Sequence, residues 1–391
     1  MKTLHVFDLF TPHTNGTIKL LYELSKALLL RKQEVTIYCS DFKIDQSYID
    51  SLQGLKAYPF HSRFNLAGFR IMPDIIGESR RGLTSFDIIH LHSFRSFANV
   101  VIHHYAKKYG IPYVVDAHGS APRTAVGKRG FKWLLKWLFD IAFGYRILRD
   151  ASMVIAETRV GINEYKELGV KEDKIALITP PLAVEEFANL PPQGLFRQKH
   201  AIKAKHIVMF LGRINWIKGL DFLVESFYEL AQHRNDVILV IVGPDDGYKP
   251  TLDKLIEKLN LSDRVLFTGF LVGKDKLSAL VDADIVVQTS RYEQGAWAPF
   301  EAVLCSTPII VSSNSGAGED VRRIDAGYLV EWGNRSDLVD KIQYVFDNPD
   351  QAAIKTRKAR EYLETNQSMS SKIREYEELY ARCIEEKRKR R

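Results

Sequence analysis

Residues 291–311 read RYEQGAWAPFEAVLCSTPIIV and place two glutamates, Glu293 and Glu301, on either side of a loop of small residues. Pro299 stands where a helix would begin, a position at which its missing N–H is not needed. The apolar run 309–311 predicts a strand. This stretch therefore predicts a loop, a helix and a strand in succession, which is the basic unit of an α/β fold.

The loop between the two glutamates is the first candidate site. If a helix starts near residue 298, the backbone N–H groups before it converge on one point and favour an anion. The residues of this loop and helix start are Gly295, Ala296, Trp297 and Ala298. Two carboxylates beside an anion indicate a ligand that is part phosphate and part polyhydroxyl. Nucleotide sugars have this composition.

Apolar runs recur on both sides of this stretch and alternate with segments of helical period. The expected strands are 4–9, 35–39, 88–92, 113–116, 153–156 and 175–178, followed by 207–211, 237–242, 265–267, 285–288, 309–311 and 328–330. Nearly continuous apolar strands are typical of parallel sheets that helices cover on both faces. Two similar sets of strands predict two doubly wound, Rossmann-like α/β domains that face each other across a cleft.

The boundaries follow changes in composition. We expect an N-terminal, acceptor-side domain over residues 1–183, a proline-rich and basic linker over 184–203, and a nucleotide-sugar-binding domain over 204–365. The last segment, 366–391, contains an amphipathic helix that we expect to return to the N-terminal domain, and it ends in the basic run KRKRR.

Composition narrows the class of protein. The chain has 391 residues and no apolar run of 18 residues, so we expect a cytoplasmic protein without a transmembrane helix. Three cysteines, widely spaced, form no metal-ligand pattern. The net charge of +7 favours an anionic partner, but no nucleic-acid-binding module accompanies it. We therefore expect no bound nucleic acid and no metal site.

A basic segment, GRINWIKG at residues 212–219, follows the first strand of the second set. Arg213 offers a planar fork for phosphate oxygens and Lys218 a compact charge. At the entry of a helix, both would reach one diphosphate. Taken alone, the segment slightly favours a solvated basic loop.

In their order and spacing, these motifs resemble the family 4 glycosyltransferases, which have the GT-B fold. The similarity covers roughly residues 1–380. It includes the Gly-Arg…Lys-Gly segment, the two glutamates and the segments FDIIHLHS and IPYVVDAHGS. It implies a retaining, metal-independent transfer of a sugar from a nucleotide-diphosphate sugar to a hydroxyl group, with no further cofactor.

The resemblance assigns roles to residues of this chain. Glu293 and His118 would lie against the donor sugar, and Arg213 and Lys218 would hold the departing diphosphate; these four are the expected catalytic residues. Glu301 would accept hydrogen bonds from the ribose. The other expected ligand contacts are Asn15, Gly16, Phe270, Leu271 and the loop residues 295–298.

Departures from the family pattern leave alternatives open. Relatives commonly carry Glu-Gly-Phe-Gly where this chain has Glu293-Gln294-Gly295-Ala296. The donor sugar and base therefore stay unassigned. A catalytically inactive, sugar-nucleotide-binding scaffold subunit is one alternative. A nucleotide-sugar epimerase or hydrolase on a similar fold is another.

The segment Phe131–Arg149, FKWLLKWLFDIAFGYRILR, is the strongest feature outside the site. Aromatic residues beside lysines on a helix are typical of binding to an anionic membrane surface. A core helix whose lysines extend to solvent fits equally well. The first reading implies a peripheral protein at the inner face of the cell membrane, acting on a lipid-linked saccharide or glycan precursor.

Overall fold

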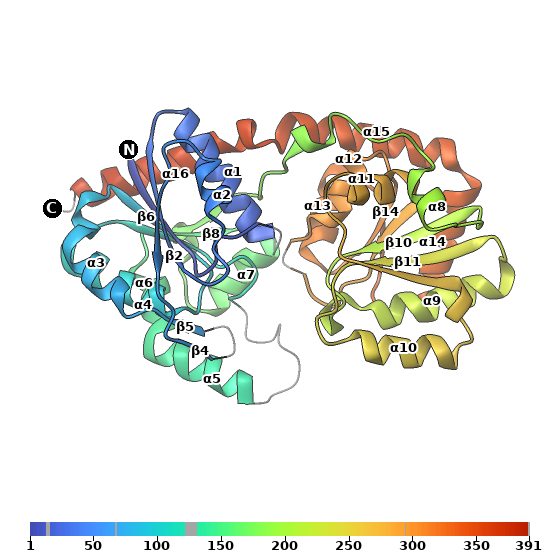
Figure 1. Ribbon diagram of the computed structural model, residues 1–391, viewed down its shortest axis with the longest axis horizontal. Coiled ribbons are helices and arrows are strands. Elements are labelled where there is room, and N and C mark those ends of the chain that lie inside the picture. The colour runs from blue at the N-terminus through green and yellow to red at the C-terminus, as the bar shows by residue number, and fades with distance from the viewer. Residues whose placement is uncertain (13–15, 67–68, 122–130, 294, 390–391) are drawn as a thin grey trace. The chain divides into compact units, whose positions relative to one another are not determined.

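A computed structural model describes residues 1–12, 16–66, 69–121, 131–293 and 295–389, and at residues 131 and 132 it describes only the backbone. The chain forms two compact units (Figure 1). The first unit comprises Met1–Pro181 and Met369–Arg391, and the second comprises Leu182–Ser368.

In its described part, the first unit contains a seven-stranded sheet in the order β3-β2-β1-β6-β7-β8-β9, and every pairing is parallel. The strands are β1 (Lys2–Val6), β2 (Glu34–Ser40), β3 (Lys56–Phe60), β6 (Ile88–His92), β7 (Tyr113–Asp116), β8 (Met153–Ala156) and β9 (Ile175–Leu177). A short antiparallel pair, β4 (Phe64–Leu66) and β5 (Phe69–Ile71), stands apart from this sheet.

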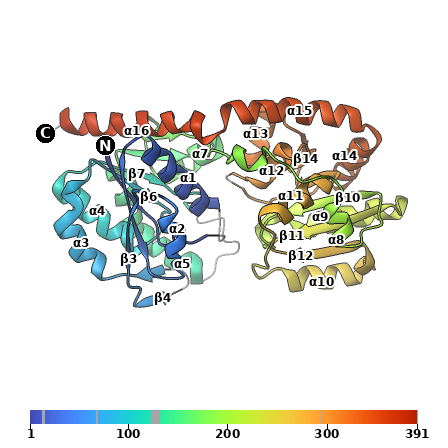
Figure 2. The same cartoon turned by 45° about the horizontal axis from the view of Figure 1, so that its top comes forward.

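Helices cover both faces of the first sheet. They are α1 (Gly16–Leu30), α2 (Gln46–Asp50), α3 (Asp74–Gly82), α4 (Phe97–Tyr109), α5 (Phe131–Phe139), α6 (Tyr145–Asp150), α7 (Arg159–Glu167) and α16 (Met369–Lys389), with short turns η1 (Leu83–Ser85), η3 (Asp140–Gly144) and η4 (Glu172–Lys174). In Figures 1 and 2, α1 lies beside α16, although the two are far apart in the sequence.

The two faces of β6 carry different side chains because successive strand residues point in opposite directions. Ile89 and Leu91 pack with α4 in one hydrophobic core. His90 and His92 point to the other face, where His90 meets Tyr380 of α16. The face with the histidines is therefore polar inside a fully buried layer, which is unusual for a central parallel strand.

The second unit repeats the plan with six parallel strands in the order β12-β11-β10-β13-β14-β15. These are β10 (His206–Leu211), β11 (Val237–Val242), β12 (Val265–Gly269), β13 (Ile285–Gln288), β14 (Ile309–Ser312) and β15 (Tyr328–Val330). Counted along the unit, this is the order 3-2-1-4-5-6 of the Rossmann fold. The prediction of two doubly wound α/β units is confirmed.

The helices of the second unit also form two layers. They are α8 (Leu195–Lys199), α9 (Leu220–His233), α10 (Lys249–Lys258), α11 (Gly273–Asp282), α12 (Ala298–Leu304), α13 (Gly316–Ile324), α14 (Arg335–Asp347) and α15 (Pro349–Asn366), with short turns η5 (Val184–Phe187), η6 (Trp216–Lys218) and η7 (Ser262–Arg264). One core packs α9, α10 and α14 against the sheet. The other packs α8, α11, α12, α13 and α15.

Residues 184–203 are not a free linker, because they belong to the second unit. Phe187 and Phe196 are buried in its core. Asp282 accepts hydrogen bonds from the backbone N–H groups of Gly194 (2.5 Å) and Arg197 (2.9 Å), which fixes the start of α8. Asp284, two residues later, accepts a hydrogen bond from the backbone N–H of Ile207 on β10 at 2.8 Å, so both aspartates hold backbone segments of the second unit in place.

The segment Phe131–Arg149 is not one continuous α-helix. Its α5 and α6 parts are joined by the π turn η3, whose Asp140 is fully buried and forms an ion pair with Arg95 (Nε–Oδ1, 2.8 Å). Many of its apolar side chains are exposed: Leu134, Leu135, Trp137, Leu138, Ile141 and Phe143. These six residues are called the α5 apolar surface below.

None of the described helices combines the length and the apolar character needed to cross a bilayer.

Candidate functional site

The candidate site in the second unit lies at the topological switch point of the sheet, where the strand order reverses between β10 and β13. Strands β10 and β13 are neighbours, but the chain leaves them toward opposite edges of the sheet. Loops that follow two such strands lie side by side at their carboxyl ends, where ligands of this fold bind. The loops are residues 212–219 after β10 and residues 289–297 after β13. They contain three of the four expected catalytic residues.

Lys218 and Glu293 meet at this point. The ammonium group of Lys218 contacts Oε2 of Glu293 in an ion pair, and Ser290 Oγ donates to the same oxygen at 3.0 Å. Both charged side chains are mostly buried, with 16% and 15% exposed. A partly buried pair feels a lower dielectric constant than an exposed one, so an incoming phosphate or hydroxyl would interact with it strongly.

Gly219 allows the two loops to approach each other. Its φ of 64° lies in the left-handed region, and a Cβ atom at this position would lie 2.1 Å from the backbone oxygen of Thr289. Thr289 in turn donates from Oγ1 to the carbonyl of Gly219 at 3.0 Å. Glycine is therefore required to place Lys218 next to the loop of Glu293.

Glu301 forms a second lysine–glutamate pair. It is the fourth residue of α12, and its Oε1 lies 3.0 Å from Nζ of Lys276 on α11. Gly295, Ala296, Trp297 and Ala298 are all half-buried just before or at the start of α12. The helix has only seven residues. So short a helix adds only a weak dipole at the predicted anion site.

Arg213 lies apart from these pairs. Its side chain is 62% exposed, and Nη1 contacts Oδ2 of Asp246 at 2.6 Å. Asn215 donates to the same carboxylate oxygen at 2.8 Å. The carboxylate of Asp246 therefore engages one amino group of the Arg213 guanidinium.

The remaining expected contacts of the second unit differ in exposure. Phe270 is 55% exposed after β12, where a flat ring is available for stacking. Leu271 packs against the core of the α11 and α12 layer instead. In the first unit, Gly16 is exposed and begins α1. Asn15 lies outside the described residues, as does Gln294.

His118 lies at the carboxyl end of β7 in the first unit, with a φ of 46° and a side chain that is only 7% exposed. Its Nδ1 is 2.8 Å from Oε1 of Glu157 and 3.2 Å from Oδ1 of Asp116. Burial lowers the pKa of His118, but Asp116 and Glu157 together raise it by more, so the pKa lies above its ordinary value. Burial raises the pKa of Asp116 to about 7.

Several site neighbours carry no strong signal in the sequence. Lys276 lies on α11 and meets Glu301 only because the fold brings their helices together. Arg291 packs its guanidinium 4.8 Å from the ring centres of Trp216 and Trp332 and pairs with Asp221. Glu157 does have a signal, because it directly follows the apolar strand β8, at the same sheet edge as His118.

Two family models match the chain. The model described as Glycosyltransferase Family 4 matches residues 14–186, and the model described as Glycosyl transferases group 1 matches residues 193–365. Between them they span most of both units.

Curated relatives and solved structures agree with these models. The chain is 24% identical over 248 residues to alpha-D-kanosaminyltransferase of Streptomyces kanamyceticus, covering 62% of this chain and 63% of that protein. It is 29% identical over 196 residues to mannosylfructose-phosphate synthase of Agrobacterium fabrum, covering 46% and 43%. The match thus spans less than two thirds of either relative. The crystal structure of Anabaena Alr3699/HepE in complex with UDP-glucose is 19% identical, with a TM-score of 0.78 over 97% of this chain and 99% of that one. At this identity, the likeness shows the fold.

Proposed function

Because the chain belongs to the family 4 glycosyltransferases, whose fold is GT-B, we propose that it transfers a sugar from a nucleotide-diphosphate sugar to a hydroxyl acceptor. The observation that carries the proposal is the pair of lysine–glutamate contacts at the carboxyl edge of the second sheet. Lys218 supplies positive charge for a diphosphate, and Glu293 supplies a hydrogen-bond acceptor for a sugar hydroxyl. Lys276 on α11 and Glu301 on α12 form a second pair with the same combination of charges.

The division of roles follows from the charges. As the bond to the sugar breaks, negative charge grows on the diphosphate, and a preorganised cation stabilises it. The ion pair with Glu293 holds Lys218 in place for this role. When the diphosphate binds Lys218, the carboxylate of Glu293 would be released to accept a hydrogen bond from the sugar. Arg213 would exchange Asp246 for phosphate in the same way. Glu301 would accept hydrogen bonds from the ribose.

We further propose that transfer retains the configuration of the sugar and needs no metal ion. Lys218 and Arg213 supply the positive charge that a divalent ion supplies in other transferases. We assign no side-chain nucleophile, because Glu293 is proposed to accept a hydrogen bond from a sugar hydroxyl. The anomeric configuration of the product, read by NMR, tests retention directly.

The test of the donor site is calorimetric titration with UDP, GDP and ADP, each with EDTA and with Mg²⁺. One nucleotide should bind, with the same affinity in both buffers. The variant Lys218→Ala should weaken binding about 10- to 150-fold, because it loses a charged hydrogen bond of about 1.5–3 kcal/mol. The control is Glu229→Gln, which neutralises an exposed residue of the same unit that pairs with Arg335 and should leave binding unchanged.

Turnover separates the enzyme from its alternatives. With the donor that carries the bound nucleotide, Glu293→Gln should bind but turn over at least about 10-fold more slowly. A scaffold subunit would bind the nucleotide and turn over no donor with any acceptor. An epimerase would convert the donor sugar without releasing the nucleoside diphosphate.

For the acceptor, we propose a lipid-linked saccharide at an anionic membrane surface, which the α5 apolar surface would contact. Six large apolar side chains of a single short segment are between 36% and 49% exposed. Arg146 is exposed on the same segment. Apolar side chains entering the headgroup layer, with basic residues beside them, are the arrangement of helices that lie on membranes. The exposure of these side chains argues against the core-helix alternative.

Co-sedimentation with vesicles tests this surface. Wild-type protein should bind phosphatidylglycerol vesicles more strongly than phosphatidylcholine vesicles, and Leu138→Glu should reduce the bound fraction several-fold. The control Leu30→Glu changes a leucine that is 77% exposed at the end of α1, outside this surface. Equal binding of both variants and the wild type would contradict a membrane role.

A further inference from the structure

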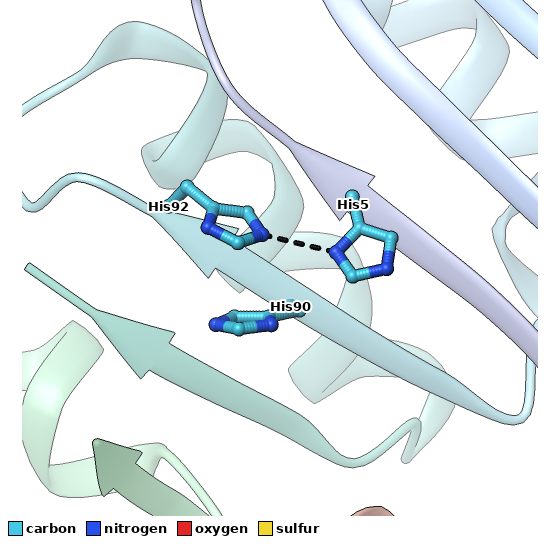
Figure 3. A group of neighbouring side chains, drawn as sticks. All are labelled: His5, His90 and His92. Atoms are coloured by element: carbon cyan, nitrogen blue, oxygen red, sulfur yellow. Dashed lines mark hydrogen bonds between the residues drawn. The ribbon is translucent and has the colours of Figure 1, made fainter. Parts of the chain in front are cut away.

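A chain of hydrogen-bonded imidazoles runs from the centre of the first sheet to His118. Nδ1 of His5 on β1 lies 2.9 Å from Nε2 of His92 on β6, and Nδ1 of His92 lies 3.0 Å from Nε2 of His118. Nδ1 of His118 then meets Glu157 at 2.8 Å. His5 and His92 are buried to 0% and 1% exposure. Figure 3 shows the inner part of this chain, with His90 beneath it.

The arrangement fits hydrogen bonding better than metal binding. Nitrogens of His5, His90 and His92 lie within 4.8 Å of one another. However, the rings of His90 and His92 stack, with centres 3.9 Å apart and planes at 28°. Because imidazole lone pairs lie in the ring plane, stacked rings do not direct them at one ion. His5 and His92 already spend one nitrogen each on their mutual hydrogen bond (Figure 3).

The protons along this chain are not independent of one another. A carboxylate only accepts, so Nδ1 of His118 donates to Glu157. If His118 is an imidazolium, its Nε2 donates to His92, which donates to His5. If His118 is neutral, the two imidazole–imidazole hydrogen bonds reverse, while Nδ1 of His118 still donates to Glu157. The charge state of His118 therefore sets the tautomers of both His92 and His5.

Two carboxylates favour the charged form. Glu157 and Asp116 both lie within 3.2 Å of Nδ1 of His118. The side chain of Glu157 is itself only 10% exposed. In such a buried place, removing the imidazolium would leave the carboxylate charge with no cation beside it, which is costly.

We propose that Glu157 and His92 are positioning residues that hold both ring nitrogens of His118, so that His118 faces a ligand as a fixed positive charge. His118 then has no free ring N–H to offer the donor sugar, and its contribution is the charge and the left-handed backbone at residues 118–119, which has φ values of 46° and 73°. This deepens the role given to His118 above and rests on the proposed function. A fixed cation would stabilise the negative charge that builds up on the leaving diphosphate, without any reorganisation.

The test is long-range ¹H–¹⁵N NMR of the full chain labelled at histidine, with His118 assigned by the signal that His118→Gln removes. At pH 7.5 both ring nitrogens of His118 should carry protons in the wild type. Glu157→Gln keeps an acceptor oxygen but removes the charge, and it should lower the imidazolium-to-neutral ratio of His118 at least about 10-fold, equal to one pKa unit. Glu157→Asp keeps the negative charge, so its imidazolium-to-neutral ratio at His118 should lie between those of Glu157→Gln and the wild type.

The control variant is His103→Gln, which removes another imidazole–carboxylate contact of the first unit, to Asp150 at 3.1 Å. It should leave the His118 signals unchanged. A neutral His118 in the wild type would overturn the proposal, as would signals that Glu157→Gln does not move. If Glu157→Gln fails to fold, the wild-type spectrum and Glu157→Asp still decide the question.

Kinetics extend the test to catalysis. With a donor that the wild type turns over, Glu157→Gln should lower kcat about 10-fold or more, in the range typical of residues that orient a site group, with KM changed less. If the wild type turns over no donor at all, the proposed function fails while the NMR result still stands. Unchanged kcat together with a neutralised His118 would show that its charge has no role in the reaction.

Discussion

His5 offers the sharpest physical test of how the buried histidines His5, His90 and His92 affect stability. Its ring is fully buried beside those of His90 and His92 on β6, and burial lowers its pKa from 6.5 to about 3. In the unfolded chain the ring is free to bind a proton below pH 6.5, whereas in the folded chain it stays neutral. The stabilisation is therefore complete above pH 6.5 and is lost as the pH falls toward the folded value.

The size of the effect follows from linkage. Each pH unit between the two pKa values costs about 1.4 kcal/mol, and pH 5.0 lies about 1.5 units below the unfolded pKa. His5 should therefore cost the wild type about 2 kcal/mol at pH 5.0 that it does not cost at pH 7.5. The variant His5→Gln lacks a titrating ring. Its stability deficit relative to the wild type should shrink by about 2 kcal/mol between these two pH values.

The assay is unfolding in urea, read by hydrogen exchange of peptides from β1 and β6, which report the first unit alone. Comparing variant with wild type cancels other titrations of this unit, such as that of Asp8, whose pKa burial raises to about 7. His104→Gln, which removes an exposed imidazole on α4, is the control and should show the same deficit at both pH values. A deficit of His5→Gln that does not change with pH would refute the reasoning.

Two further substitutions test how the structure is held together. Gly219→Ala should destabilise the second unit by about 3 kcal/mol or more in chemical denaturation, because it adds a clash with the Thr289 carbonyl to the strain of a positive φ. The control Gly247→Ala should cost only about 1 kcal/mol, because its φ is 86° but its Cβ would meet nothing within 4 Å. Arg95→Met should cost about 3–5 kcal/mol in the same assay, because it removes the cation that pairs with the buried carboxylate of Asp140. A loss below about 1 kcal/mol would contradict this prediction.

Strand positions were predictable because buried parallel strands are nearly continuous apolar runs. All twelve expected strands are present in the two sheets. Strand β3 was not predicted: its residues KAYPF include Pro59 and are largely exposed at the edge of the first sheet. An edge strand needs neither an apolar run nor every backbone N–H, so neither signal marks it.

The expected linker at 184–203 shows the limit of composition as a guide. Its prolines and basic residues are typical of linkers. Yet Phe187 and Phe196, two isolated aromatic residues in that segment, anchor it in the core of the second unit. Burial of two rings outweighs a polar average because each removes a large apolar area from water.

Some residues of the candidate site could likewise be predicted from the sequence, and others could not. Lys218 and Glu293 could be expected to lie together because their loops follow neighbouring strands at the point where the strand order reverses. The partner Lys276 could not be singled out, because its contact with Glu301 depends on how α11 and α12 pack over the strands. Glu157 was missed although it directly follows the apolar strand β8. The π turn at Asp140–Gly144 was also beyond the sequence argument, since a regular 3.6-residue period conceals one inserted residue.

The proposed activity depends most directly on a nucleotide-sugar site at Lys218 and Glu293. The measurement that tests it is the release of nucleoside diphosphate from UDP-, GDP- and ADP-sugars by wild type, Lys218→Ala and Glu229→Gln, with lipid-linked and free saccharides as acceptors. We expect release with one donor class, unchanged in Glu229→Gln and lost in Lys218→Ala. Release that Lys218→Ala leaves intact would contradict the assignment of this site, and no release with any donor would contradict the proposed activity.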